Sequence, residues 1–249
     1  MSGFRTAVTF LTRLPIGDGE KPNVDAAPAW FPIVGLLIGA VTGLVFWGGA
    51  KVFGPLPAAA LAVAVGALIT GAFHQDGLAD TADAFGGGWT VEQRLAIFKD
   101  SRHGTYGVMS LVLIVVLQVA ALSDLLPWQG FFALVAAHGL GRCGAVALML
   151  VLPPVRADGL GAGLADRTPR DLAIGSIIAT VAIVAVAIRI SSVLLIGSAF
   201  LATAAVGWLA HRKIGGIVGD VLGAAEQVVE AAVLLTAAAL ATQLGRWPF

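Results

Sequence analysis

Apolar runs long enough to cross a lipid bilayer follow one another along nearly the whole of this 249-residue chain. A membrane-spanning helix needs about 20 consecutive apolar residues to cross about 30 Å of hydrocarbon. Hydrophobic residues make up 58% of the sequence and charged residues only 12%, which lies outside the usual range of soluble domains. We therefore predict an all-α protein, a polytopic bundle of transmembrane helices with short interfacial helices on its cytoplasmic side.

We place about seven spans within one integral membrane domain that covers residues 1–249. They run from Phe31 to Ala50, Leu56 to Phe73, Tyr106 to Leu125, Gln129 to Leu152, Leu172 to Ile190, Ser192 to Ala210 and Gly219 to Leu244. The fifth and sixth are separated by so little that they form either a tight hairpin or one broken pair. The apolar segment Phe4 to Leu14 is short and contains two arginines, so we expect an interfacial helix within a cytoplasmic arm of residues 1–30 and not a signal peptide.

Basic residues test this layout, because loops rich in Lys and Arg stay in the cytoplasm. Eleven of the 15 basic residues fall on one side of the seven spans: Arg5, Arg13, Lys21, Arg94, Lys99, Arg102, Arg156, Arg167, Arg170, Arg212 and Lys213. Acidic residues contribute little to orientation, yet only Asp124 lies on the opposite side. This asymmetry predicts a polar site that faces the cytoplasm, and a solvated rim of the bundle is the alternative.

Three carboxylates occupy helical spacings in the segment from His74 to Asp83. Asp76, Asp80 and Asp83 fall within an arc of roughly 60°, so they repel one another unless they share a cation. Hard oxygen ligands suit Mg²⁺ or Ca²⁺, and we predict a divalent-metal site on a cytoplasmic active-site loop, residues 74–106. The alternative is an acidic first turn that complements the helix dipole, which explains Asp76 better than Asp83. His74 projects from nearly the opposite face, as a packing residue or as a ligand.

A basic run that contains glycines, from Lys99 to Gly107, follows on the same predicted loop. Charge, guanidinium geometry, hydroxyl groups and close backbone approach are what phosphate oxygens require. The alternative is an ordinary basic loop beside a span, but the neighbouring carboxylates favour phosphate contact. The candidates for that contact are Lys99, Ser101, Arg102, Gly104 and Thr105.

Polar side chains also occur inside the predicted spans, where a charge is costly unless it faces a cavity, a cation or a partner. Asp220, Gln227 and Glu230 share an arc of roughly 80° at the start of the last span. His138 and Arg142 lie one turn apart near the middle of the fourth span. Arg142 either pairs with one of these acids or holds a phosphate group of a substrate, and the sequence does not separate the two. Gln227 is a further candidate for contact with the substrate.

Acids for a divalent metal and a basic loop in a membrane setting together suggest metal-assisted transfer of a phosphate-containing group to an alcohol. At these motifs the chain resembles the cobalamin 5′-phosphate synthase family, the adenosylcobinamide-GDP ribazoletransferases. The resemblance is carried by His74–Asp83, Gly86–Gly88, Lys99–Arg102, Gly104–Gly107, Gly219–Ala224 with Gln227 and Glu230, and by Phe10–Pro15 and Trp30–Leu37. The sequence departs from the family pattern at Ala84, where glycine is expected, and at His103, where an aliphatic residue is expected.

The resemblance implies an enzyme that uses Mg²⁺ to join adenosylcobinamide-GDP to α-ribazole or α-ribazole 5′-phosphate, with release of GMP. It implies Mg²⁺ on Asp76, Asp80 and Asp83, with Lys99 and Arg102 on the diphosphate. One acid must then help to deprotonate the attacking hydroxyl: our hypothesis is Asp83, and Asp220 or Glu230 could equally serve. The implied location is a bacterial inner membrane with the active site facing the cytoplasm. Association with other enzymes of cobalamin assembly and an oligomeric state are both compatible with this picture.

Two other classes stay open. A CDP-alcohol phosphotransferase also places an acidic cluster at a membrane interface, but the longer Asp-Gly-x-x-Ala-Arg pattern of that class is not present at Asp76. An ion or solute transporter uses intramembrane acids near the bilayer midplane, whereas most clusters here lie at the predicted cytoplasmic edge. The single cysteine, Cys143, excludes an internal disulfide, and a net charge of zero gives no electrostatic case for nucleic acid. The glycine-containing segment Asp158 to Arg170 is the candidate for closing over substrate.

Overall fold

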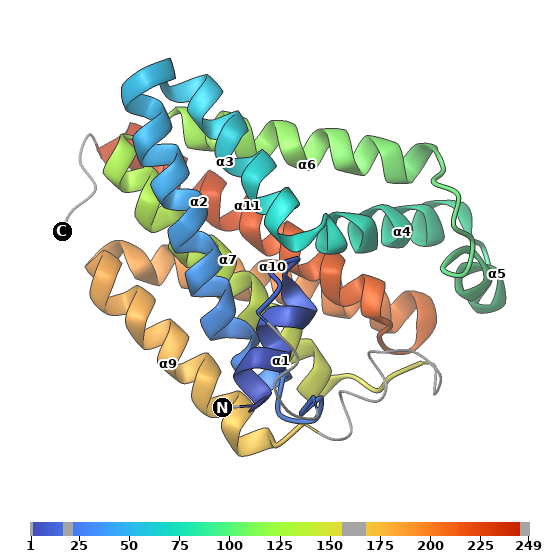
Figure 1. The fold of residues 1–249 in the computed structure, drawn as a ribbon. Helices are drawn as coiled ribbons and strands as arrows, with labels where there is room; N and C mark the ends of the chain where they lie inside the picture. Colours follow the sequence, from blue (N-terminus) through green and yellow to red (C-terminus); the bar gives the residue numbers. More distant parts are fainter. Residues whose placement is uncertain (1, 17–21, 156–167, 245–249) are drawn as a thin grey trace.

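The computed structural model describes residues 2–16, 22–155 and 168–244, and its regular elements are helical throughout these ranges. In chain order they are α1 (Ser2–Leu11), η1 (Pro28–Trp30), α2 (Phe31–Phe53), α3 (Pro55–Thr70), α4 (Phe73–Gly87), α5 (Val91–Ile97), α6 (Thr105–Ser123), α7 (Pro127–Val151), α9 (Arg170–Ile188), η2 (Arg189–Ser191), α10 (Ser192–Ile214) and α11 (Gly219–Leu244) (Figure 1). The prediction of an all-α protein is confirmed. Lys21, Arg156, Arg167 and residues 158–167 of the segment expected to close over substrate lie outside the described ranges.

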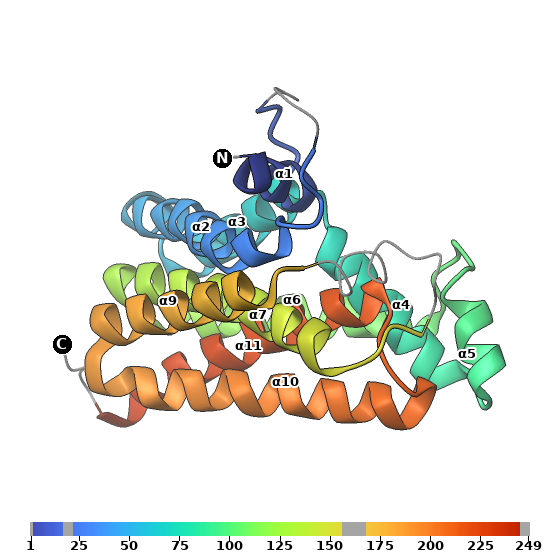
Figure 2. The ribbon, with the colours of Figure 1, turned by 90° about the horizontal axis from the view of Figure 1, so that it is seen from below.

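Five helical stretches are long and apolar enough to cross a membrane, and a sixth is added when the bent pair α3 and α4 counts as one span. One of the five, Arg170–Ile214, is 45 residues long and contains both α9 and α10. The chain turns back on itself at η2 between these two helices, as Figure 2 shows. Of the two expected arrangements, a tight hairpin or one broken pair, the structure has the hairpin. The predicted count of about seven spans is therefore approximate, and the chain is a membrane protein with several apolar helices.

The predicted second span, Leu56 to Phe73, is wrong at its C-terminal end. Helix α3 stops at Thr70, and the next two residues, Gly71 and Ala72, adopt left-handed φ angles of 64° and 58°. Glycine enters this region without steric cost, whereas alanine does so only where the surroundings hold it. Helix α4 then leaves at 91° to α3, so most of the segment expected to be an active-site loop is helical.

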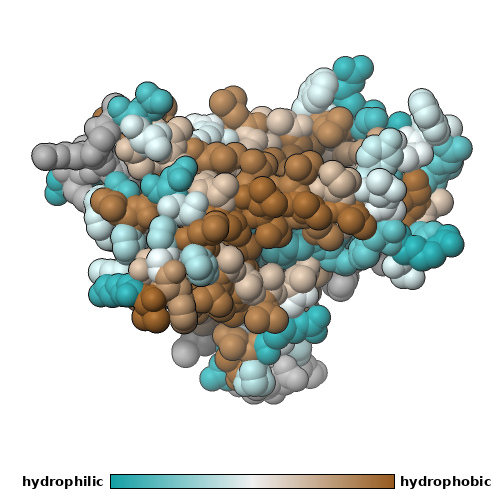
Figure 3. Space-filling view, turned by 90° about the horizontal axis from the view of Figure 1, so that it is seen from above, coloured by the Kyte–Doolittle hydropathy of each residue, from teal (hydrophilic) through white to brown (hydrophobic). Residues whose placement is uncertain are grey.

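Helices α7 and α11 form the centre of the bundle. In the most apolar windows of these helices 78% and 72% of the residues are buried, against 28% in α6 and in α9–α10. Glycines bring α2 against α7, because a Cβ on Gly39 would lie 2.5 Å from the carbonyl oxygen of Leu134. The surface of the bundle is also largely apolar. Figure 3 shows hydrophobic side chains across the middle of one face of the molecule and hydrophilic side chains toward the ends of that face.

The short helix predicted near the N-terminus is present as α1. Its buried residues Ala7, Val8 and Leu11 pack with Phe31 and Val34 of α2. Beyond α1, the backbone N–H of Arg13 donates to the carbonyl oxygen of Ile69 at 2.7 Å. The N-terminal arm is thereby fastened to the end of α3, beside the bend at which α4 begins.

Candidate active site

Asp76 and Asp80 lie one turn apart on α4, and His103 closes over them from the loop that precedes α6. The His103 ring nitrogens Nε2 and Nδ1 lie 3.7 Å from an Asp76 oxygen and 3.5 Å from an Asp80 oxygen. One possible ligand atom from each of the three residues lies within 4.8 Å of the others. The Asp76 side chain is 62% exposed and Asp80 19%, so the group opens to the surface. Sequence reasoning noted His103 only as a departure and missed it as a candidate ligand.

Asp83 is held differently from the two acids that precede it. It is buried, and its two carboxylate oxygens accept hydrogen bonds from the backbone N–H groups of Gly104 at 2.6 Å and Gly107 at 2.9 Å. Gly104 is the N-cap of α6, so the carboxylate satisfies donors that a helix start leaves unpaired. A Cβ on Gly104 would lie 2.6 Å from Asp83 Oδ1, which explains why glycine stands there. The geometry makes Asp83 the anchor of the loop, and its roles as metal ligand and as base stay predictions.

We expect the Asp83→Asn variant to release this loop. The asparagine NH₂ group would face one of the two backbone N–H donors, and each lost hydrogen bond to a charged group costs about 1.5–3 kcal/mol. Trypsin should then cut after Lys99 or Arg102 roughly tenfold faster than in the unaltered protein, because these costs raise the open population. Asp124→Asn, at the exposed C-cap of α6, is the matched control. Unchanged cleavage in Asp83→Asn would show that the carboxylate does not anchor the loop.

The anchored loop presents the predicted phosphate-binding residues to solvent. Lys99, Ser101 and Arg102 are exposed, and the Arg102 guanidinium donates to the Asp100 carboxylate through Nε at 2.9 Å and Nη2 at 2.6 Å. These hydrogen bonds lower the pKa of Asp100 to about 2. An exposed ion pair of this kind contributes little to stability, so Arg102 can exchange Asp100 for a phosphate group. Phosphate contact by Lys99, Ser101, Arg102, Gly104 and Thr105 remains a prediction.

Basic residues from distant parts of the sequence meet at this end of the molecule. Arg94 Nη1 donates to the carbonyl oxygen of Lys213 at 2.8 Å, and Lys213 Nζ donates to the carbonyl oxygen of Phe85 at 3.1 Å. These bonds join the end of α10 to α4 and α5, which lie together in Figure 1. Two of the basic residues predicted to share one side of the membrane, Arg94 and Lys213, are thus brought together around the C-terminal half of α4.

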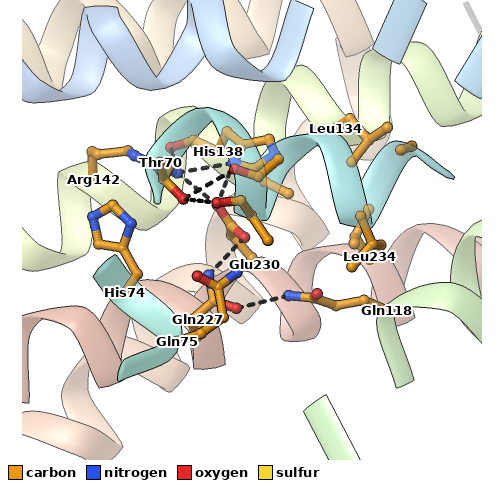
Figure 4. Close-up of a pocket in the computed structure, with 15 residues that line it drawn as sticks. Thr70, His74, Gln75, Gln118, Leu134, His138, Arg142, Gln227, Glu230 and Leu234 are labelled. Atoms are coloured by element: carbon orange, nitrogen blue, oxygen red, sulfur yellow. Dashed lines mark hydrogen bonds and ion pairs between the residues drawn. The ribbon is translucent and has the colours of Figure 1, made fainter. Parts of the chain in front are cut away.

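A second polar group lies inside the bundle, between α7 and α11 (Figure 4). Arg142 Nη1 contacts Glu230 Oε1 at 2.6 Å and also forms an ion pair with Glu226, and His138 contacts Glu230. Gln227 Nε2 donates to Glu226 at 2.9 Å and to Glu230 at 3.1 Å. All five side chains are buried, with Arg142 only 1% exposed. Of the two alternatives for Arg142, the structure shows the pairing with acids of the last span, and contact with a substrate phosphate stays a prediction.

This buried network reaches α4 from the side opposite to the Asp76–Asp80–His103 group. His74 Nδ1 lies 3.5 Å from Glu226 Oε2. His74 and Asp76 are two residues apart on α4, so their side chains point in directions that differ by about 160° around the helix axis. The structure therefore does not bring Glu230, Gln227 or Arg142 into the exposed acidic group. Glu226 lies somewhat further round α11 than Asp220, Gln227 and Glu230, and helical spacing alone did not predict its part in the network.

Asp220 lies where α11 meets α4. Its backbone packs against Gly77, since a Cβ on Gly77 would lie 2.7 Å from the Asp220 carbonyl oxygen. The Asp220 side chain is partly exposed, unlike those of Asp83 and Glu230. Of the three acids predicted as candidate bases, Asp220 is the one that combines partial exposure with a position beside α4.

Comparison with known proteins shows the family to which the chain belongs. The family model described as cobalamin-5-phosphate synthase matches residues 3–238. The chain belongs to this family. A cobalamin-5-phosphate synthase is an enzyme, and the resemblance seen at the sequence motifs is confirmed.

Curated relatives of this chain carry the name adenosylcobinamide-GDP ribazoletransferase. The protein from Bradyrhizobium diazoefficiens is 43% identical over 256 residues, covering 99% of this chain and 96% of the relative. The Mesorhizobium japonicum protein is 40% identical over 92% of this chain and 90% of its own length, and the Chlorobaculum tepidum protein is 39% identical over 96% and 95%. No solved structure matches the chain.

Proposed function

We propose that this protein is an adenosylcobinamide-GDP ribazoletransferase that depends on Mg²⁺ and works at the cytoplasmic face of a bacterial inner membrane. The observation that carries the proposal is the convergence of Asp76 and Asp80 beside a basic loop, at one end of a membrane helix bundle of this family. The donor would be adenosylcobinamide-GDP, and the acceptor α-ribazole or its 5′-phosphate. The orientation rests on the basic residues gathered at that end.

The residues present fit a divalent cation. Two carboxylates held one turn apart on a helix repel each other, and a shared cation removes that repulsion. Asp76 and Asp80 would hold Mg²⁺, and His103 would be a neighbouring nitrogen ligand. Asp83 is the third carboxylate that the family resemblance implies as a ligand of Mg²⁺. Bound Mg²⁺ would neutralise charge on the diphosphate and help the GMP oxygen to leave.

The reaction forms one phosphorus–oxygen bond and breaks another. The ribazole hydroxyl attacks the phosphorus attached to cobinamide, its proton passes to a carboxylate, and GMP leaves with the electrons of the broken bond. Lys99 and Arg102 would hold the diphosphate oxygens, and the N–H group of Thr105 lies at the positive end of α6, whereas that of Gly104 already donates to Asp83. Its partial exposure favours Asp220 as the proton acceptor over Asp83 and Glu230, which are both buried.

The purified protein in lipid nanodiscs tests this proposal. With adenosylcobinamide-GDP and α-ribazole we expect GMP and the cobalamin product to form in equal amounts, to stop with EDTA, and to resume with excess Mg²⁺. Release of GMP without α-ribazole would contradict the transferase and indicate a hydrolase. Product formation that continues in EDTA would contradict the metal requirement alone.

A further inference from the structure

A mainly apolar pocket lies where α1, α2, α4, α7 and α11 meet. Three phenylalanines from three of these elements form its aromatic wall: Phe10, Phe31 and Phe73. Polar side chains of the buried network also line it: His74, whose ring meets Phe73 edge-on at 5.3 Å, Arg142 and Glu226. None of the residues of the exposed acidic group lines this pocket. The pocket is therefore a second, mainly apolar compartment of the same region.

The three phenylalanines are arranged as a wall for a flat group. Phe10 stacks on Phe31 with ring centroids 5.4 Å apart and 13° between the planes, and Phe73 meets Phe10 edge-on at 5.5 Å. Phe31 is buried, whereas Phe73 is 43% exposed. Aromatic side chains favour offset stacked or edge-to-face neighbours, and a flat ring that enters beside Phe73 satisfies both preferences.

The polar side chains of the lining offer few hydrogen-bonding groups. Arg142 is 1% exposed, and its Nε has no hydrogen-bond partner among the residues that the structure describes. A buried donor without a partner costs about 1–3 kcal/mol, and a ligand atom that accepts a hydrogen bond recovers this cost. The lining suits a ring with one free acceptor nitrogen and apolar edges. Guanine does not fit, because its edge carries several donors and acceptors that an apolar wall leaves unpaired.

The aromatic wall continues into the acidic face of α4. Phe73 and Asp80 are seven residues apart and therefore within about 20° of each other around the helix, and Asp76 lies one turn beyond Phe73. At 1.5 Å per residue, the rise from Phe73 is about 4.5 Å to Asp76 and about 10.5 Å to Asp80. A nucleoside whose base rests against Phe73 can thus direct its ribose hydroxyls toward these two carboxylates.

We infer that this pocket binds the benzimidazole base of the acceptor nucleoside and sets the position of the attacking hydroxyl. The inference rests on the proposed function, which supplies the acceptor. The base would lie against Phe73 and the Phe10–Phe31 pair, with its free ring nitrogen turned toward Arg142 or His74. The pocket is then the element that selects a flat, apolar base.

The inference is tested by a larger side chain on α7 that fills the pocket. Ala145 lines it, and Ala147 is two residues further along the same helix, is also partly buried and does not line it. Binding of α-ribazole is followed by benzimidazole fluorescence, and binding of adenosylcobinamide-GDP by corrinoid absorbance, both in nanodiscs. We expect Ala145→Phe to raise the Kd for α-ribazole at least about tenfold and to leave that for adenosylcobinamide-GDP unchanged, because an overfilled pocket excludes the base. Ala147→Phe should change neither.

A second variant covers the case in which Ala145→Phe fails to fold. Phe73→Ala removes an exposed ring and should also raise the Kd for α-ribazole alone. Unchanged α-ribazole binding in the folded variants overturns the inference, as does a rise in the Kd for adenosylcobinamide-GDP instead. A co-purified phospholipid that Ala145→Phe displaces without any effect on α-ribazole overturns it as well. If the unaltered protein binds α-ribazole but forms no product, the proposed function fails and the pocket assignment is still decided by these Kd values.

Discussion

The Asp80→Asn enzyme will form product at least about 100-fold more slowly than the unaltered enzyme at saturating Mg²⁺. Asparagine keeps the shape of the side chain but removes one of the two charges that Asp76 and Asp80 offer to a cation. Loss of a group that stabilises charge in a phosphoryl-transfer transition state typically costs a factor of about 10²–10³. Asp76→Asn should behave in the same way, and the double variant should lose less than the product of the two effects, because both residues act through one cation.

Metal affinity gives this prediction a readout that does not depend on turnover. Mn²⁺ binding, followed by electron paramagnetic resonance, should weaken in both single variants. Asp171→Asn is the matched control, since Asp171 is an exposed acid in the first turn of another helix, α9. Equal Mn²⁺ affinity in Asp80→Asn and Asp171→Asn would mean that the acids of α4 complement the helix dipole and do not bind a metal.

Hydropathy predicts the helices well but not the bend between α3 and α4. The apolar run continues through Gly71 and Ala72 to Phe73, so composition gives no reason to end a helix at Thr70. A turn there depends on two left-handed residues, one of them an alanine that its surroundings must hold in place. The position of α4 across the end of the bundle, which determines where Asp76 and Asp80 lie, was therefore beyond sequence reasoning.

Helical spacing predicts which side chains share a face but not what meets that face. Asp83 lies in the arc of Asp76 and Asp80, yet the start of α6, 21 residues along the chain, covers it. Glu226 lies outside the arc of Asp220, Gln227 and Glu230, yet Arg142 of α7 and His74 of α4 both reach it. His103 enters the acidic group from a loop whose path is fixed by the Asp83 hydrogen bonds. Each of these depends on long-range packing, which periodicity within one helix does not contain.

The Arg142→Met variant will unfold at a markedly lower temperature than the unaltered protein. Methionine keeps the length of the side chain but leaves Glu226 and Glu230 buried without their cation, and removal of one partner of a buried ion pair costs about 3–5 kcal/mol. For a chain of this size that corresponds to a fall of about 10 °C. The single cysteine reports the transition, because Cys143 is buried beside Arg142 on α7 and reacts with a thiol-specific fluorophore only when the bundle opens.

Two further variants separate the two roles that the sequence leaves open for Arg142. Arg142→Met combined with Glu230→Gln removes one carboxylate together with the arginine and should melt above Arg142→Met alone, since less unpaired charge remains buried. Arg212→Met, at an exposed arginine near the end of α10, should melt like the unaltered protein. An Arg142→Met protein that melts normally but forms no product would contradict the structural role and assign Arg142 to the substrate. A large fall in melting temperature, partly reversed by Glu230→Gln, places the arginine in the internal charge balance of the bundle.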